Sequence, residues 1–92
     1  MEINLKGTGI LQEYFGKETH VLELPDDSSV QDLLVKIEEG WGNRLPAYLW
    51  NYSEHHFRGP VVLVLDNVVV RDFSVLLKDG STVQLVKALA GG

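Results

Sequence analysis

The spacing of apolar residues predicts one amphipathic helix near the middle of the chain. After Ser29, apolar residues recur at the i, i+3, i+4 and i+7 positions of a single helix face, namely Val30, Leu33, Leu34 and Ile37. Ser29 and Asp32 have the spacing of a capping box, and Gly40 and Gly42 are expected to end the helix. The intervening polar residues are expected to face water: Gln31, Asp32, Lys36, Glu38 and Glu39.

Alternation of apolar and polar residues predicts strands on both sides of this helix. Residues 2–6 and 18–24 are expected to form a hairpin around a loop or bulge at Gly7, Gly9 and Gly16, with His20 half-buried in its second strand. Residues 61–65 and 68–70 are expected to form a second hairpin, because Asp66-Asn67 between them tolerates the positive φ of a tight turn. In a last strand, Thr82 to Lys87, Val86 points away from the face that carries Val83 and Leu85.

The aromatic stretch from Trp41 to Gly59 is expected to be irregular, apart from a short helical turn at Pro46. It holds five of the eight aromatic residues, and we expect it to cap an open edge of the core. A role in binding a particular partner is the alternative.

The order β-β-α-β-β-β predicts an α+β fold in which one helix covers one face of a sheet. We expect the strands of the first hairpin to be central and the helix to cross over to a strand parallel to the first. Residues 1–87 are expected to form one domain, followed by a tail at residues 88–92.

Composition and charge narrow the range of partners. The chain has 92 residues and a formal net charge of -5, so its long-range field repels phosphate backbones and anionic membranes. It has no cysteine, which excludes disulfides, thiolate nucleophiles and metal sites with sulfur ligands. The longest apolar run, Val61 to Leu65, is far too short to span a membrane. We therefore expect a cytoplasmic protein that binds neither nucleic acid nor membranes.

Few residues are candidates for conventional chemistry. Glu54-His55-His56 is the one cluster of metal-ligand types, but adjacent loop histidines seldom converge without a third ligand, so no metal is expected. Gly7-Thr8-Gly9 lacks the third glycine of a dinucleotide fingerprint and is expected to be a turn.

The last five residues, Ala88 to Gly92, carry no charge and end in two residues without a side chain. They are expected to project as a flexible tail that reaches at most roughly 16–18 Å, thin enough for a narrow pocket. A carboxylate is a poor acyl donor until ATP converts it to an acyl-adenylate, which sulfur or nitrogen nucleophiles attack. The reactive group would be the carboxyl carbon of Gly92.

At this point the sequence resembles the ubiquitin-like β-grasp sulfur carriers, which include the small subunit of molybdopterin synthase and the thiamine-pathway sulfur carrier. The resemblance depends on the order of five motifs: Gly16-Lys17, Leu24-Pro25 followed by Ser29 to Leu34, Val64 to Asn67, Leu77 to Val83, and Ala90-Gly91-Gly92. It implies a mixed four- to five-stranded sheet with one main helix on one face and a flexible Gly-Gly tail.

The resemblance also implies a function in which the protein is a cosubstrate rather than an enzyme. An E1-like adenylating enzyme would use ATP to activate Gly92, whose thiocarboxylate would then donate sulfur in the active site of a synthase large subunit. No cofactor would be bound. The partners would hold Gly91, Ala90 and Leu89 of the tail. An interface with another protein needs an apolar centre, so Val86 and Phe73 are further candidates for contact on the uncovered sheet face. A place in the core is the alternative for each: strand alternation puts Val86 on the face opposite Val83 and Leu85, whereas Phe73 has no clear register.

Two other functions are compatible with the same features. The chain could be a protein modifier that forms an isopeptide bond between Gly92 and a target lysine. It could also be an interaction module that docks through its open sheet face or an edge strand, with an incidental Gly-Gly ending.

Overall fold

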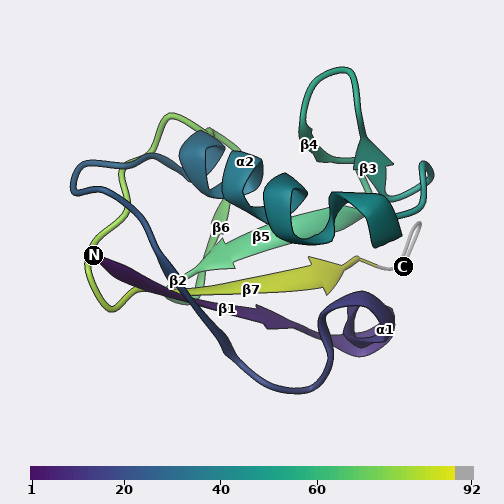
Figure 1. Ribbon diagram of the computed structural model, residues 1–92, viewed down its shortest axis with the longest axis horizontal. Helices are drawn as coiled ribbons and strands as arrows, with labels where there is room; N and C mark the ends of the chain where they lie inside the picture. Colours follow the sequence, from purple (N-terminus) through teal and green to yellow (C-terminus); the bar gives the residue numbers. More distant parts are fainter. Residues whose placement is uncertain (89–92) are drawn as a thin grey trace.

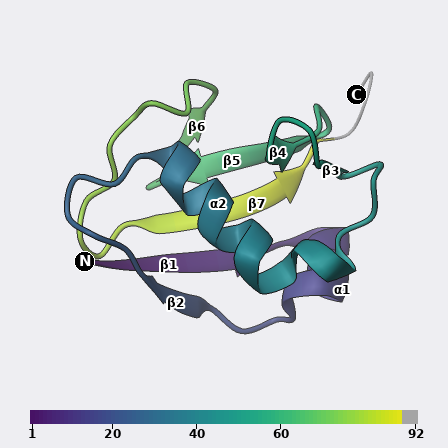
Figure 2. The same cartoon turned by 45° about the horizontal axis from the view of Figure 1, so that its top comes forward.

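The computed structural model describes residues 1–88, which form two layers, with helix α2 lying across one face of a five-stranded mixed sheet (Figures 1 and 2). The predicted α+β fold is confirmed. The elements are β1 (Glu2–Gly7), a 3-10 helix (Gly9–Leu11), α1 (Gln12–Phe15), β2 (His20–Glu23), α2 (Val30–Trp41), a second 3-10 helix (Gly42–Arg44), β3 (Trp50–Asn51), β4 (His56–Phe57), β5 (Val61–Leu65), β6 (Val68–Val70) and β7 (Thr82–Lys87). Within residues 1–88, no helix combines the length and apolar character needed to cross a membrane.

The strand order of the main sheet is β2-β1-β7-β5-β6, which places the last strand of the chain at the centre. β1 pairs antiparallel with β2 and parallel with β7, and β5 pairs antiparallel with both β7 and β6. The first hairpin forms as predicted, but its central position was wrong, because β2 lies at an edge. The strand parallel to β1 is β7, more than 70 residues away in the chain, and alternation within each strand carries no information on such a pairing.

Helix α2 begins and packs as its sequence predicts. The Asp32 N–H donates to Ser29 Oγ over 3.2 Å, while the Ser29 N–H donates to Asp32 Oδ2 over 2.8 Å, completing the capping box. All four residues of the apolar stripe are fully buried against the sheet: Val30, Leu33, Leu34 and Ile37. The predicted end is displaced slightly, since Gly40 lies within the helix and Gly42 is its C-cap.

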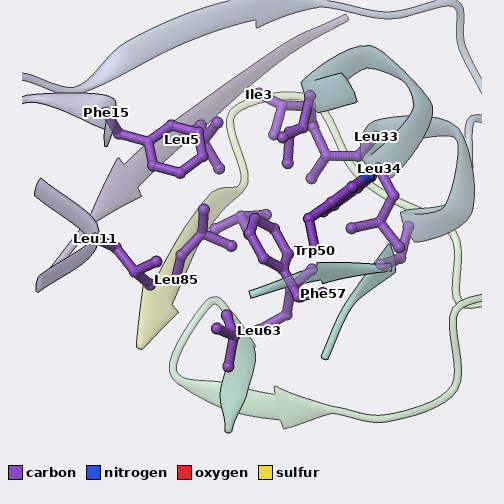
Figure 3. Close-up of a cluster of buried hydrophobic side chains, with 14 of the residues drawn as sticks. Ile3, Leu5, Leu11, Phe15, Leu33, Leu34, Trp50, Phe57, Leu63 and Leu85 are labelled. Atoms are coloured by element: carbon purple, nitrogen blue, oxygen red, sulfur yellow. The ribbon is translucent and has the colours of Figure 1, made fainter. Parts of the chain in front are cut away.

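The aromatic segment closes the core on the side of α2, as expected of a cap. Figure 3 shows Trp50 lying among the side chains of α2 and the sheet, with Phe57 beside it; their rings meet edge to face with centroids 4.8 Å apart. The two residues lie on β3 and β4, which pair as a small hairpin, so the expectation of a segment that is irregular apart from the turn at Pro46 was wrong. The Pro46 carbonyl accepts from the N–H groups of Leu49 and Trp50, forming the predicted turn.

The connection between β1 and β2 is helical rather than the predicted loop or bulge. Gly7 lies against it so closely that an added Cβ would be 3.2 Å from both the Leu11 carbonyl oxygen and Phe15 Cβ. This packing buries Leu11 and Phe15 at the end of the sheet where β1 and β7 both finish. In the β5–β6 hairpin the prediction is confirmed, with positive φ at Asp66 (47°) and Asn67 (70°).

Candidate functional site

Hydrogen bonds from two neighbouring segments fix the chain where it leaves β7. The Thr8 hydroxyl and N–H both donate to the Leu85 carbonyl oxygen, over 2.8 and 3.1 Å, and the Ala88 N–H donates to the Pro60 carbonyl oxygen over 2.7 Å. A shallow groove of about 380 Å³ runs beside this exit, lined by Thr8, Gly9, Ile10, Val86 and Lys87. We call these five residues and Ala88 the tail root. The predicted tail residues Leu89, Ala90, Gly91 and Gly92 lie outside the described residues.

The tail root adjoins an apolar area on the uncovered face of the sheet. Val62 of β5 lies opposite Val86 of β7, and Val64 lies two pairs further along, opposite Gln84. Because their strand neighbours Val61, Leu63 and Leu85 are buried under α2, these three half-buried valines project from the other face. We call Val62, Val64 and Val86 the valine patch; the predicted orientation of Val86 is confirmed.

The same face has a different character over β1 and β2. The side chains there that alternate with buried residues are mostly polar or charged: Glu2, Asn4, Lys6, Val21 and Glu23. The open face therefore has a polar half and an apolar half, with the chain exit beside the apolar half. An apolar centre with a polar surround is the arrangement that protein interfaces use.

Phe73, the other predicted interface residue, lies on the opposite side of the sheet from Val86. It packs against the core, its ring centroid lies 5.7 Å from that of His56 on β4, and it lines a hollow of about 230 Å³ whose other residues include Phe57 and Leu63. Its carbonyl oxygen accepts from the Gln31 N–H in the first turn of α2. Of the two placements that the sequence left open for Phe73, the structure shows the one against the core. Phe73 lies three residues beyond the end of β6, so strand alternation could not assign it to a face.

The histidines contact nearby carboxylates rather than one another. His55 Nδ1 lies 2.7 Å from Glu38 Oε2, and His56 Nε2 lies 2.9 Å from Glu54 Oε2. His20 is half-buried as predicted, with its Nε2 at 2.5 Å from the Phe15 carbonyl oxygen. Within residues 1–88, no three potential ligands among His, Cys, Asp and Glu are grouped to hold a metal ion.

Glu38 has a structural role that the sequence analysis missed. Its Oε1 accepts from Trp50 Nε1 over 3.1 Å, and this bond, followed by the contact with His55, lowers the pKa of the Glu38 carboxyl. The carboxylate thus joins α2 to the β3–β4 hairpin instead of facing water. A signal was present, because Glu38 lies four residues after Leu34 and so continues the buried stripe.

Several solved structures superpose on this chain over nearly its whole length. The chain superposes on the small archaeal modifier protein SAMP1 from Haloferax volcanii with a TM-score of 0.81 at 15% identity, covering 100% of both chains. It matches Urm1 from Trypanosoma brucei (TM-score 0.76, 18% identity, 99% of this chain and 95% of that one). It also matches a chain in the complex of subunits 1 and 2 of molybdopterin-converting factor from Helicobacter pylori (TM-score 0.65, 16% identity, 100% of both).

These likenesses confirm the ubiquitin-like β-grasp fold that the sequence resemblance implied. No protein-family model matches the chain, and no curated protein sequence matches it. Since the identities are all low, the comparisons establish the fold, and function has to be argued from the tail root, the valine patch and the tail sequence.

Proposed function

We propose that this protein is a sulfur carrier in cofactor biosynthesis, with a molybdopterin-type cofactor as the leading candidate. Gly92 would be adenylated by an E1-like enzyme with ATP, converted to a thiocarboxylate, and used as the sulfur donor in the active site of a synthase large subunit. The observation that carries the proposal is the sequence Ala90-Gly91-Gly92, which follows the anchored last strand of a β-grasp domain after two intervening residues. In this role the protein is a cosubstrate that works in the cytoplasm, where ATP is available.

The chemistry assigns separate tasks to the carrier and its partner. The Gly92 carboxylate attacks the α-phosphorus of ATP and displaces pyrophosphate; a sulfide equivalent then attacks the acyl carbon and displaces AMP. The carrier contributes the acyl group and the means of presenting it. Two residues without Cβ atoms let the backbone enter a narrow channel, and any larger residue there would meet its walls.

The valine patch and the tail root would form the surface on which the partner docks while it receives the tail. A partner that covers Val62, Val64 and Val86 buries an apolar centre next to the chain exit, so that docking also aims the tail. The hydrogen bonds of Thr8 and Ala88 keep the exit in place relative to that centre. Leu89, Ala90 and Gly91 would then be the tail residues that the partner holds.

A second candidate is a protein modifier joined through Gly92 to a lysine of its target. The specific observation in its favour is the likeness to small archaeal modifier proteins. Both functions need the same activated acyl group, and they differ in the nucleophile that receives it.

Intact-mass spectrometry tests the proposal directly. The protein is incubated with its adenylating enzyme, ATP and a sulfide donor, and the expected product is heavier by the difference between one sulfur and one oxygen atom. A chain without Gly91 and Gly92 is the matched control and should stay unchanged. Gly-Gly remnants on target lysines after proteolysis would instead identify a modifier, and a mass unchanged by every treatment would leave an interaction module.

Partner docking is tested separately with Val86→Asp, because a carboxylate in the valine patch must be desolvated on binding. We expect adenylation to slow by about tenfold or more. Val21→Asp, on the polar half of the same face, is the control and should react at the original rate. Equal rates for the two variants would remove the valine patch from the docking surface.

A further inference from the structure

β1 leaves the sheet earlier than its neighbour β7, beside the point where the chain exits (Figure 1). The parallel ladder between these strands ends at the pair Gly7–Leu85, whereas β7 continues for two more residues to Lys87. If the ladder went on, the Thr8 carbonyl oxygen would accept from the Lys87 N–H. It accepts instead from the Leu11 N–H over 3.0 Å, because the chain has turned into a 3-10 helix. The end of β7 is therefore open on this side.

The Lys87 N–H points into this opening. The next residue, Ala88, donates its N–H to the Pro60 carbonyl oxygen on the β5 side, over 2.7 Å. In an antiparallel pair, residues bonded across to the partner alternate with residues whose N–H points the other way. The N–H of Lys87 is thus on the side that β1 has left, where the tail-root groove of about 380 Å³ lies. An open strand edge beside a groove is suited to receive an extended chain.

The length of the tail indicates what covers the opening. Under the proposed function, on which this inference rests, Gly92 is the reactive residue, and it follows Ala88 by only four residues. An enzyme that encloses Gly91 and Gly92 leaves two residues before Ala88, so its surface comes within roughly 7 Å of the chain exit. At that distance it meets the groove, including the half-buried apolar side chains of Ile10 and Val86 that line it.

We propose that an extended segment of the adenylating enzyme occupies this opening as a short added strand. A carbonyl oxygen of that segment accepts from the Lys87 N–H, and its apolar side chains lie on Ile10 and Val86. The added strand takes the position that β1 gives up and continues alongside the tail, so that it fixes the direction in which Gly92 enters the enzyme. A sulfur carrier and a protein modifier both need such an enzyme, so the added strand would serve either function.

Lys87→Pro and Lys87→Ala separate the backbone from the side chain. Because Lys87 and Val61 form a non-bonded pair, the proline removes the N–H without removing a bond to β5. Binding of the full chain to the enzyme is measured by isothermal titration calorimetry without ATP. It should weaken by about tenfold for Lys87→Pro and stay within about twofold of the original for Lys87→Ala.

Hydrogen exchange of the unsubstituted chain gives a readout that does not depend on the folding of the proline variant. In the free protein the Lys87 amide should exchange faster than the Ala88 amide, which is bonded to Pro60. Addition of the enzyme should then slow exchange at Lys87 by about tenfold or more.

Failure of this inference is distinguishable from failure of the proposed function, because the intact mass reports adenylation in the same samples. Equal binding of Lys87→Pro and Lys87→Ala would overturn the added strand, and so would a Lys87 amide that the enzyme leaves unprotected. Adenylation of Gly92 would still support the proposed function in both cases. A chain that is not adenylated at all would remove the proposed function and the added strand together.

Discussion

The two faces of the sheet are built from the same strands, and they differ in what covers them. On β7, Val83 and Leu85 are fully buried beneath α2, whereas Gln84 and Val86 are half-buried on the open face. The covered face also receives Trp50 and Phe57 from the β3–β4 hairpin. If the open face docks a partner as proposed above, strand alternation separates stability from recognition, and substitutions one residue apart should affect one property at a time.

Trp50→Ala should cause the largest loss of stability among substitutions on the covered face. Trp50 is fully buried and donates a hydrogen bond to Glu38 Oε1, so its loss leaves a cavity and removes the partner of that oxygen. We expect the free energy of unfolding to fall by about 3–5 kcal/mol, measured by urea denaturation. Tyr48→Ala, in the same segment but 56% exposed, is the control. Equal losses would mean that the aromatic segment is not part of the core.

Val83→Ala and Val86→Ala compare the two faces with one residue type on one strand. Val83 is fully buried, so its truncation should cost about 2 kcal/mol in the free energy of unfolding. Val86→Ala should cost less than about 1 kcal/mol, because its side chain already contacts water. The urea midpoints of the two variants measure the difference. A larger loss for Val86 would contradict the assignment of the open face.

Ser29→Ala tests how far the covered face depends on the position of α2. The substitution removes the side-chain acceptor for the Asp32 N–H and should lower the free energy of unfolding by about 1 kcal/mol. Since the valine patch lies on the other face, adenylation of the folded protein should be unaffected. Thermal unfolding and the adenylation rate together check this. A variant that unfolds at the original temperature but is adenylated more slowly would indicate that α2 takes part in docking.

Local signals in the sequence predicted the features that depend on neighbouring residues. The apolar stripe and capping box of α2, and the Asp66-Asn67 turn, are set within a few residues, and all three are confirmed. Helix α1 has four residues, too few to show a helical period. The strands β3 and β4 have two residues each, too few to show alternation, and their pairing accompanies the packing of Trp50 on Phe57. The central position of β7 depends on contacts distant in the chain, which no local pattern encodes.

The candidate site was predicted only in part, for similar reasons. Val86 was placed by alternation within a strand, whereas Phe73 lies outside any strand, so the sequence left its side of the sheet open. Val62 and Val64 were missed as partners of Val86 because their alignment depends on the β5–β7 register. The predictions for Leu89, Ala90, Gly91 and Gly92 rest on the tail sequence itself and remain for the mass measurements to test.

The smallest expected change in the free energy of unfolding concerns Glu38, which joins α2 to the β3–β4 hairpin at the edge of the covered face. Hydrogen bonds from Trp50, and then from His55, lower its pKa below the ordinary value of 4.5, so the ionised carboxylate stabilises the folded state. That contribution is complete above pH 4.5 and is lost as the pH falls through the lowered pKa of the folded protein. Glu38→Gln should therefore cost less than about 1 kcal/mol at neutral pH, and the difference from the original protein should shrink in acid.

Urea denaturation of both proteins at several pH values measures this difference, with Glu39→Gln, an exposed neighbour on the same helix, as the control. A difference that grew toward low pH would mean that the protonated carboxyl is the stabilising form. The bonds to Trp50 and His55 would then not be what holds the hairpin to α2. Apolar packing alone would then stabilise the covered face, including the contact between α2 and the β3–β4 hairpin. The covered face would differ from the open face more strongly than the hydrogen bonds suggest.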